Sequence, residues 1–148
     1  MKEELDRKLC EKYPLLFKNR HAPMTETCMC FGFEHGDGWY SIIDNLCENI
    51  QNHIDWSHKH KAWSLDWNEE HPDKQIGVGE IVPQVVVDQV KSKFGTLRFY
   101  YSGGDDAIDG MVRMAESMSG VLCEECGDLV ENRVHGRGCK LCDTHQKK

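Results

Sequence analysis

Long apolar segments are the first feature that the sequence lacks. No window approaches the roughly 20 apolar residues that a membrane-spanning helix needs. The first residues, MKEELDRKLCEKY, are charged where a secretory signal peptide would carry an apolar stretch. We therefore expect a protein that is neither exported nor bound to a membrane, and we place it in the cytoplasm.

Signatures of common enzyme classes are also missing. No glycine-rich loop of the kind that cradles nucleotide phosphates occurs, and no serine or cysteine stands in a recognisable nucleophile elbow. Internal repeats, low-complexity tracts and linkers rich in proline and serine are absent as well. These absences argue against an enzyme, and they leave any domain boundary to be placed from cysteine density and periodicity.

Positive charge is in deficit. The chain has 18 Lys and Arg against 25 Asp and Glu, a formal net charge of −7. Because nucleic acid is bound first through neutralisation of its phosphates, this balance opposes a broad nucleic-acid interface. Residues 120–148 contain five basic and five acidic side chains, so all the excess acid lies upstream of residue 120.

Helical spacing of apolar residues appears first in two segments. Residues 2–10 place Leu5 and Leu9 on one face, and Pro14 ends the segment because proline cannot continue a helix. A second helix can be capped by Asp37. It would bury one apolar stripe, made of Trp39, Ile42, Ile43, Leu46, Ile50 and Ile54.

Tryptophan and histidine then dominate residues 53–72 without a clean period. We interpret this stretch as an irregular packed segment. Its tryptophans, Trp56, Trp63 and Trp67, are expected in the core, since acidic residues around them would repel the phosphates of a base-stacking ligand.

A β-hairpin and a third helix are predicted next. Residues 81–90 and 96–102 are rich in Val, Ile, Phe and Tyr, and Gly95 between them favours a tight reversal. Asp105 or Asp106 can cap a helix that stops at Gly120. Helices with a hairpin predict an α+β core domain over residues 1–119, with helices packed on a small antiparallel sheet centred on the hairpin.

Cysteines concentrate in residues 120–148, which we predict to form a zinc-binding knuckle. Cys123 and Cys126 are spaced to bind one tetrahedral ion, and Gly127 permits the tight turn that points both sulfurs inward. The second ligand pair is either Cys139 with Cys142 or Cys142 with His145. A ligand pair on the first turn of a short terminal helix is the treble-clef arrangement, and it allows both pairings.

A resemblance bears on that choice. The hairpin Lys93-Phe94-Gly95-Thr96-Leu97-Arg98-Phe99-Tyr100, the following Ser-Gly-Gly-Asp and the tail Cys-x-x-Cys-Gly with Leu-Cys-Asp-x-His resemble a diffuse group of small uncharacterised phage and prophage proteins, with a weaker similarity around residues 36–39. The resemblance implies that Cys123, Cys126, Cys142 and His145 are the zinc ligands, with Cys139 as the substitute for the fourth. Four protein ligands leave no open position for water, so we expect one structural zinc ion.

Other metal and catalytic sites are weaker hypotheses. A second metal site could in principle be formed by Cys28 and Cys30 with Cys10, Cys47, His53, His58, His60 and His71, but Cys-x-Cys and His-x-His are loose signals. Asp105, Asp106 and Asp109 are explained by the preference of a helix N-terminus for acidic residues. A nuclease of the HNH type needs a base and a further ligand between its knuckles, and only fifteen residues separate Cys126 from Cys142.

The function predicted from the sequence is that of a non-enzymatic interaction protein. The resemblance to phage proteins implies a partner inside an infected bacterium, and an acidic surface suits a basic host or defence protein. One alternative is a nucleic-acid-binding accessory factor that uses the basic residues of the zinc end: Arg133, Arg137, Lys140, Lys147 and Lys148. The other is a metal-dependent hydrolase or nuclease with a cleft at His53, His58 and His60 or at the Asp105 cluster. The sequence makes no prediction of the oligomeric state.

Overall fold

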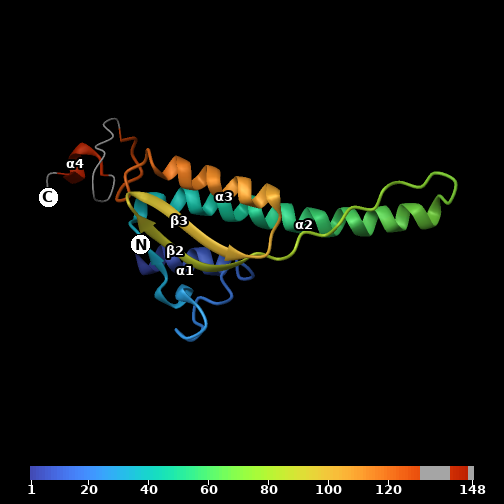
Figure 1. Cartoon of the computed structure of the whole chain (residues 1–148), viewed down its shortest axis with the longest axis horizontal. Helices are drawn as coiled ribbons and strands as arrows, with labels where there is room; N and C mark the ends of the chain where they lie inside the picture. The colour runs from blue at the N-terminus through green and yellow to red at the C-terminus, as the bar shows by residue number, and fades with distance from the viewer. Residues whose placement is uncertain (131–140, 147–148) are drawn as a thin grey trace.

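A small mixed sheet stands beside the helices (Figure 1). The computed structural model describes residues 1–130 and 141–146. Strand β1 (Phe33–Glu34) pairs in parallel with β2 (Val86–Lys93), and β2 pairs antiparallel with β3 (Thr96–Ser102). The predicted hairpin is therefore confirmed. The sheet is mixed and not purely antiparallel as expected, because β1 adds a parallel neighbour to β2.

Four helices and two short 3₁₀ turns complete the described part of the chain. The helices are α1 (Glu3–Lys12), α2 (Tyr40–Glu70), α3 (Asp106–Ser119) and α4 (Asp143–Gln146), and the turns are η1 (Cys28–Phe31) and η2 (Asp37–Trp39). Helix α3 packs on β3, and α2 packs on α3. One cluster of buried side chains joins α1, α2, α3 and the sheet, so the α+β class is confirmed. None of the described helices is long and apolar enough to cross a membrane.

The hairpin turn follows from two residues. Phe94 and Gly95, between β2 and β3, both have positive φ, at 53° and 71°. Such a pair matches the right-handed twist of the flanking strands, which makes it a common two-residue hairpin connection. Strand β2, the first strand of the hairpin, begins at Val86 and not at residue 81, because Pro83 has no N–H to donate to a strand ladder. Just before Pro83, the N–H of Val82 donates instead to Ser57 Oγ of α2 at 2.9 Å.

Helices α1 and α3 lie close to their predicted positions. Helix α1 continues to Lys12, and its C-cap Tyr13 stands directly before Pro14. At the start of α3 the Asp105 carboxylate accepts a hydrogen bond from the Ile108 N–H at 3.1 Å. Asp105 is thus the N-cap, as the sequence predicts.

The prediction of an irregular segment over residues 53–72 is wrong. Helix α2 runs without a break to Glu70, two residues before Pro72. The apolar period fades there because the positions that α2 buries beyond Ile54 are two serines, Ser57 and Ser64. Each serine hydroxyl donates to a backbone carbonyl of the same helix, so a small polar residue is tolerated at a buried position.

The core placement of the tryptophans is also wrong. Trp56 is 61% exposed and Trp63 is 53% exposed. Figure 1 shows the second half of α2 extending past the sheet and α3, with the return segment alongside it. Asn68 holds that segment through two hydrogen bonds with the backbone of Ile76, at 2.7 and 2.9 Å. This projecting part has too few neighbours to bury large rings.

Candidate metal centre

The four predicted zinc ligands come together in the structure. The ligand atoms of Cys123, Cys126, Cys142 and His145 all lie within 4.8 Å of one another. They come from two segments, a tight turn after α3 and the segment formed by Cys142 and the short helix α4 that follows it. The cluster can hold a metal ion. Cys139, the alternative ligand, lies outside the described residues.

The turn that carries Cys123 and Cys126 is closed by its backbone. The Cys123 N–H donates to the Asp128 carbonyl at 2.7 Å, and the Gly127 N–H donates to the Cys123 carbonyl at 2.8 Å. Gly127 has a φ of +82°, a conformation that glycine adopts without the strain of a Cβ. An isolated bridge between Leu122 and Leu129 closes the base of the turn. We call residues 122–129 the knuckle.

The second ligand pair is set by one helical turn. The His145 N–H donates to the Cys142 carbonyl at 2.9 Å, which brings both side chains to the same side of α4. The Cys142 sulfur lies 3.0 Å from His145 Nδ1. Two segments remote in sequence thus each supply a local pair of ligands.

The spacing of these atoms can be compared with a tetrahedral zinc site. With Zn–S bonds of about 2.3 Å and Zn–N bonds of about 2.0–2.1 Å, tetrahedral angles place two sulfurs about 3.8 Å apart and a sulfur and a nitrogen about 3.6 Å apart. The Cys126 and Cys142 sulfurs are 3.7 Å apart, and the Cys123 sulfur is 3.6 Å from His145 Nδ1. The shorter 3.0 Å contact between Cys142 and His145 would open slightly around an ion.

Contacts within the cluster shift the pKa values of its ligands, lowering those of Cys142 and Cys123 and raising that of Cys126. The hydrogen bond from His145 lowers the pKa of the Cys142 thiol to about 6, and the same contact raises the pKa of His145. Desolvation opposes ionisation of Cys123, but backbone N–H groups around its sulfur outweigh it and lower its pKa. A thiolate beside a protonated imidazole is an arrangement in which a cation can replace the proton.

Glu124 fastens the knuckle to the core. This residue is only 5% exposed, although its two sequence neighbours at the site are a cysteine and another glutamate. Its carboxylate accepts from the Gly36 N–H at 3.1 Å and from the Ser92 hydroxyl at 2.9 Å. Its carbonyl accepts from the Gly38 N–H at 2.8 Å. The carboxylate thus bridges the loop before η2 and strand β2.

Two glycines let the knuckle approach closely. A Cβ on Gly36 would lie 2.4 Å from the Glu124 carbonyl oxygen, and a Cβ on Gly38 would lie 2.2 Å from the Cys123 carbonyl oxygen. Next to them, the fully buried Trp39 donates its indole N–H to the Leu122 carbonyl at 3.3 Å. Trp39 is buried, as the apolar stripe predicts, whereas the positioning roles of Gly36, Gly38 and Glu124 were not predicted, and for the two glycines the similarity around residues 36–39 was a signal.

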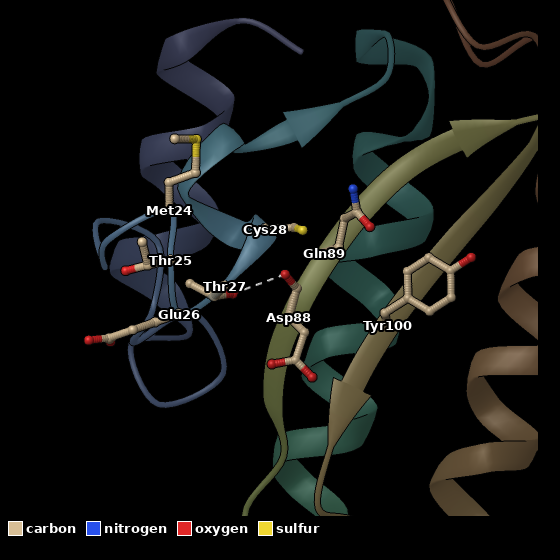
Figure 2. A pocket seen from close by; sticks show the side chains of 8 residues that line it. All are labelled: Met24, Thr25, Glu26, Thr27, Cys28, Asp88, Gln89 and Tyr100. Atoms are coloured by element: carbon tan, nitrogen blue, oxygen red, sulfur yellow. Dashed lines mark hydrogen bonds between the residues drawn. The ribbon is translucent and has the colours of Figure 1, made fainter.

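No second metal cluster occurs among residues 1–130 and 141–146. Cys47 is fully buried in the core, where desolvation raises the pKa of its thiol well above the ordinary range. Cys28 lines a surface hollow beside β2 and β3, and Figure 2 shows the carboxylates of Glu26 and Asp88 there pointing in different directions. These side chains do not converge on one point, so the hollow does not resemble a metal site.

The acidic cluster at α3 has structural partners. Asp105 caps the helix and also pairs with His53 Nε2 at 2.8 Å, while Asp109 accepts a hydrogen bond from the Tyr101 hydroxyl. These contacts agree with the structural explanation of the cluster. The metal centre at the knuckle is the site that the described residues support.

Comparisons with protein-family models, with curated proteins and with solved structures find no match. The similarity to phage and prophage proteins therefore stays a prediction, and the functional argument rests on the geometry given above.

Proposed function

We propose that the Cys and His cluster binds one zinc ion in a structural role, as a treble-clef-like module at the C-terminal end. The support is the donor set of three thiolates and one imidazole, which suits zinc, at spacings near those of a tetrahedral site. Four protein ligands leave no open position for water or substrate. The ion would then supply folding free energy to the last residues of the chain and no chemistry.

Metal analysis of the purified full-length protein tests this assignment. We expect one zinc per chain by native mass spectrometry, and loss of that zinc in Cys142→Ser. Cys28→Ser is the matched control, because Cys28 is an exposed cysteine outside the cluster. Comparing His145→Ala with Cys139→Ser identifies the fourth ligand: the variant that lowers zinc affinity more removes it. A zinc-free wild-type protein would overturn the assignment.

We further propose that the protein is a non-enzymatic interaction protein that binds a basic host or defence protein. The observation that carries this proposal is an apolar groove of about 500 Å³ between α2 and α3. Its floor includes Ile42, Leu46 and Met111, and Met114 and Met118 stand exposed along it, at 66% and 48%. Flexible methionine side chains adapt to the apolar face of a bound helix.

Charge indicates which helix would fit this groove. Ser41, Asn45 and Asn49 give α2 a polar, uncharged rim. None of the residues that line the groove is charged, and the chain as a whole has a formal net charge of −7. An amphipathic helix with a basic outer face would therefore match both the apolar floor and the surrounding field.

Affinity capture with matched variants tests the interaction. We expect the wild-type protein to retain one stoichiometric partner from a bacterial lysate, and Met114→Glu with Met118→Glu to lose it while keeping the zinc content. Met24→Glu is the control, since Met24 is 70% exposed away from the groove. Retention of the partner by the groove variant would exclude the groove as its site.

A further inference from the structure

The projecting part of α2 carries a continuous row of aromatic rings. We call residues 56–82 the arm, which comprises the second half of α2 and the return segment. Along the helix the rings of Trp56, His60, Trp63, Trp67 and His71 recur every three or four residues. Neighbouring rings contact one another, with centroid separations of 4.6, 5.7, 5.9 and 3.9 Å in that order. This aromatic stripe lies along one side of the arm.

The return segment covers one flank of the aromatic stripe and reaches the stripe itself at the tip. It bonds to Ser57 and Asn68, and the indole N–H of Trp67 donates to the Lys74 carbonyl at 3.0 Å, while Trp56 and Trp63 stay more than half exposed. At 100° per residue, Ser57 and Asn68 lie about 80° and about 100° around the helix from the centre of the aromatic stripe. His60, Trp67 and His71 are half-buried, so the exposed part of the stripe is centred on Trp56 and Trp63. Exposed neighbouring tryptophans of this kind are typical of a contact surface.

Charges along the helix of the arm are separated by sign. The part nearest the body carries Lys59 and Lys61, and the part nearest the tip carries Asp66, Glu69 and Glu70, while the return segment has both signs, with Asp73, Lys74 and Glu80. Lys59, Asp66 and Glu70 are spaced by seven and four residues, so they line one flank of the aromatic stripe. All three are exposed, and none forms an ion pair within the described residues.

We propose that two copies of this protein pair through their arms, antiparallel, with the aromatic stripes facing each other. An antiparallel helix pair has a twofold axis, so the same surface serves on both copies. With Trp63 at that axis, residue 59 of one arm lies opposite position 67 of the other arm. On that other arm, position 67 lies between Asp66 and Glu70. The same flanks meet in such a pair, and each copy's Lys59 therefore faces the partner's acidic tip.

A nucleic acid is the less suitable occupant of the stripe. Aromatic rings can stack on bases, but Asp66 and Glu70 on its flank would repel a phosphate backbone. A second arm brings its own Lys59 to those carboxylates and its own tryptophans to the rings. The arm lies apart from the groove between α2 and α3, so this inference is independent of the proposed partner site.

Charge exchange between two variants tests the pairing in the full-length, zinc-loaded protein. Lys59→Glu gives an arm that is acidic throughout its flank, and Asp66→Lys with Glu70→Lys gives one that is basic. Sedimentation equilibrium of the wild type is expected to show a dimer at concentrations up to about 100 µM, a range that detects weak association. Each charge variant alone should dissociate at least about tenfold more readily, and the two mixed should form a heterodimer.

A tryptophan variant tests the apolar part of the interface. Trp63→Ser, at the twofold axis, is expected to weaken association about thirtyfold, the effect of a hot-spot residue. Phe94→Ser is the matched control, because Phe94 is an exposed ring at the hairpin tip, 80% accessible. Circular dichroism and zinc content should be unchanged in both variants.

Three results would overturn the pairing. The first is a wild-type protein that stays monomeric over the whole concentration range. The second is a dimer that all the arm variants leave intact, since it would use another face. The third is a mixture of the two charge variants that forms no heterodimer although each folds normally. Binding of single-stranded DNA by a monomer, abolished by Trp63→Ser, would assign the stripe to nucleic acid instead.

Discussion

The two ends of the molecule are attached to the same core in opposite ways (Figure 1). At the knuckle, the Glu124 carbonyl accepts a hydrogen bond from the Gly38 N–H, and the buried Glu124 carboxylate binds the loop before η2 and strand β2. At the arm, side chains of Ser57, Trp67 and Asn68 hold a return segment against a helix that leaves Trp56 and Trp63 more than half exposed. The comparison shows that a polar residue is buried where it has fixed partners, and that aromatic residues stay outside where the fold has no second layer.

The two ends should respond very differently to an added methyl group. Gly38→Ala places a Cβ 2.2 Å from the Cys123 carbonyl oxygen, and backbone on both sides resists the displacement. We expect a loss of about 2–4 kcal/mol in the free energy of unfolding, together with weaker zinc binding. Gly77→Ala in the arm has nothing within 4 Å and should change stability by less than about 1 kcal/mol. Urea denaturation of both variants measures the contrast, and equal effects would contradict it.

Removing one carboxylate should also have a different effect on stability at each of the two ends. Glu124→Ala leaves the Gly36 N–H and the Ser92 hydroxyl without their partner in a buried place, at a cost of about 1–3 kcal/mol. Glu69→Ala, an exposed carboxylate on the arm, should stay within about 0.5 kcal/mol of the wild type. Thermal unfolding of the two variants checks this, and a neutral Glu124→Ala would show that the knuckle is not fastened as described.

Loss of the Asn68 hydrogen bonds should loosen the arm without loosening the knuckle. Asn68→Ala removes two hydrogen bonds to the backbone of Ile76, which are worth about 1 kcal/mol each. We expect faster amide hydrogen exchange at Ile76 and in the neighbouring return segment, with no change in exchange around Cys123. Faster exchange at both ends would mean that the arm and the knuckle unfold as one unit.

The smallest expected effect is a change in pH dependence at the knuckle end. His35 is 6% exposed, its Nδ1 donates to the Gly36 carbonyl at 2.7 Å, and its Nε2 has no partner among the described residues. Burial lowers the pKa of His35 below its ordinary value of 6.5, more than the Gly36 contact and the nearby carboxylates raise it. The folded state therefore binds fewer protons, so this stabilisation is present above about pH 6.5 and is lost as the pH falls through the folded-state pKa.

His35→Phe should remove that pH dependence. As the pH is lowered from about 8 to 5, the free energy of unfolding of the wild type is expected to fall more than that of His35→Phe. His58→Phe, on the exposed side of the arm, is the matched control and should give a curve parallel to that of the wild type. Parallel curves for both variants would refute the role of His35.

What the sequence could predict differs in the same way between regions. The cap at Asp105, the strand Thr96–Ser102 and the ligand pairs of the knuckle are local patterns, in which a few neighbouring residues determine the geometry. Strand β1 has two residues and exists only because β2 lies beside it, so its own sequence carries little signal. Glu124 looks like a solvent-exposed acid between two cysteines until residues 36–38 are folded against it.

The course of α2 is a further case. Its first half shows a clear apolar stripe because the core covers it, while the second half buries serines and exposes tryptophans. Rules that place large rings inside and hydroxyls outside fail where a helix leaves the body of the protein. The return segment bonds to side chains of this half of the helix, and such polar contacts leave no apolar period in the sequence.

Helix α2 also has a mechanical consequence. It begins at Tyr40, directly after the residues that hold the knuckle, and its 31 residues end at the tip of the arm. A helix of this length spans about 46 Å, and its first half is held by the core that buries Ile43, Ile50 and Ile54. A tilt of the whole helix by about 5° about its first residue would carry the tip through about 4 Å, close to the length of three residues of helix. The direction in which the arm points is therefore set by packing in the core, at a distance from the arm itself.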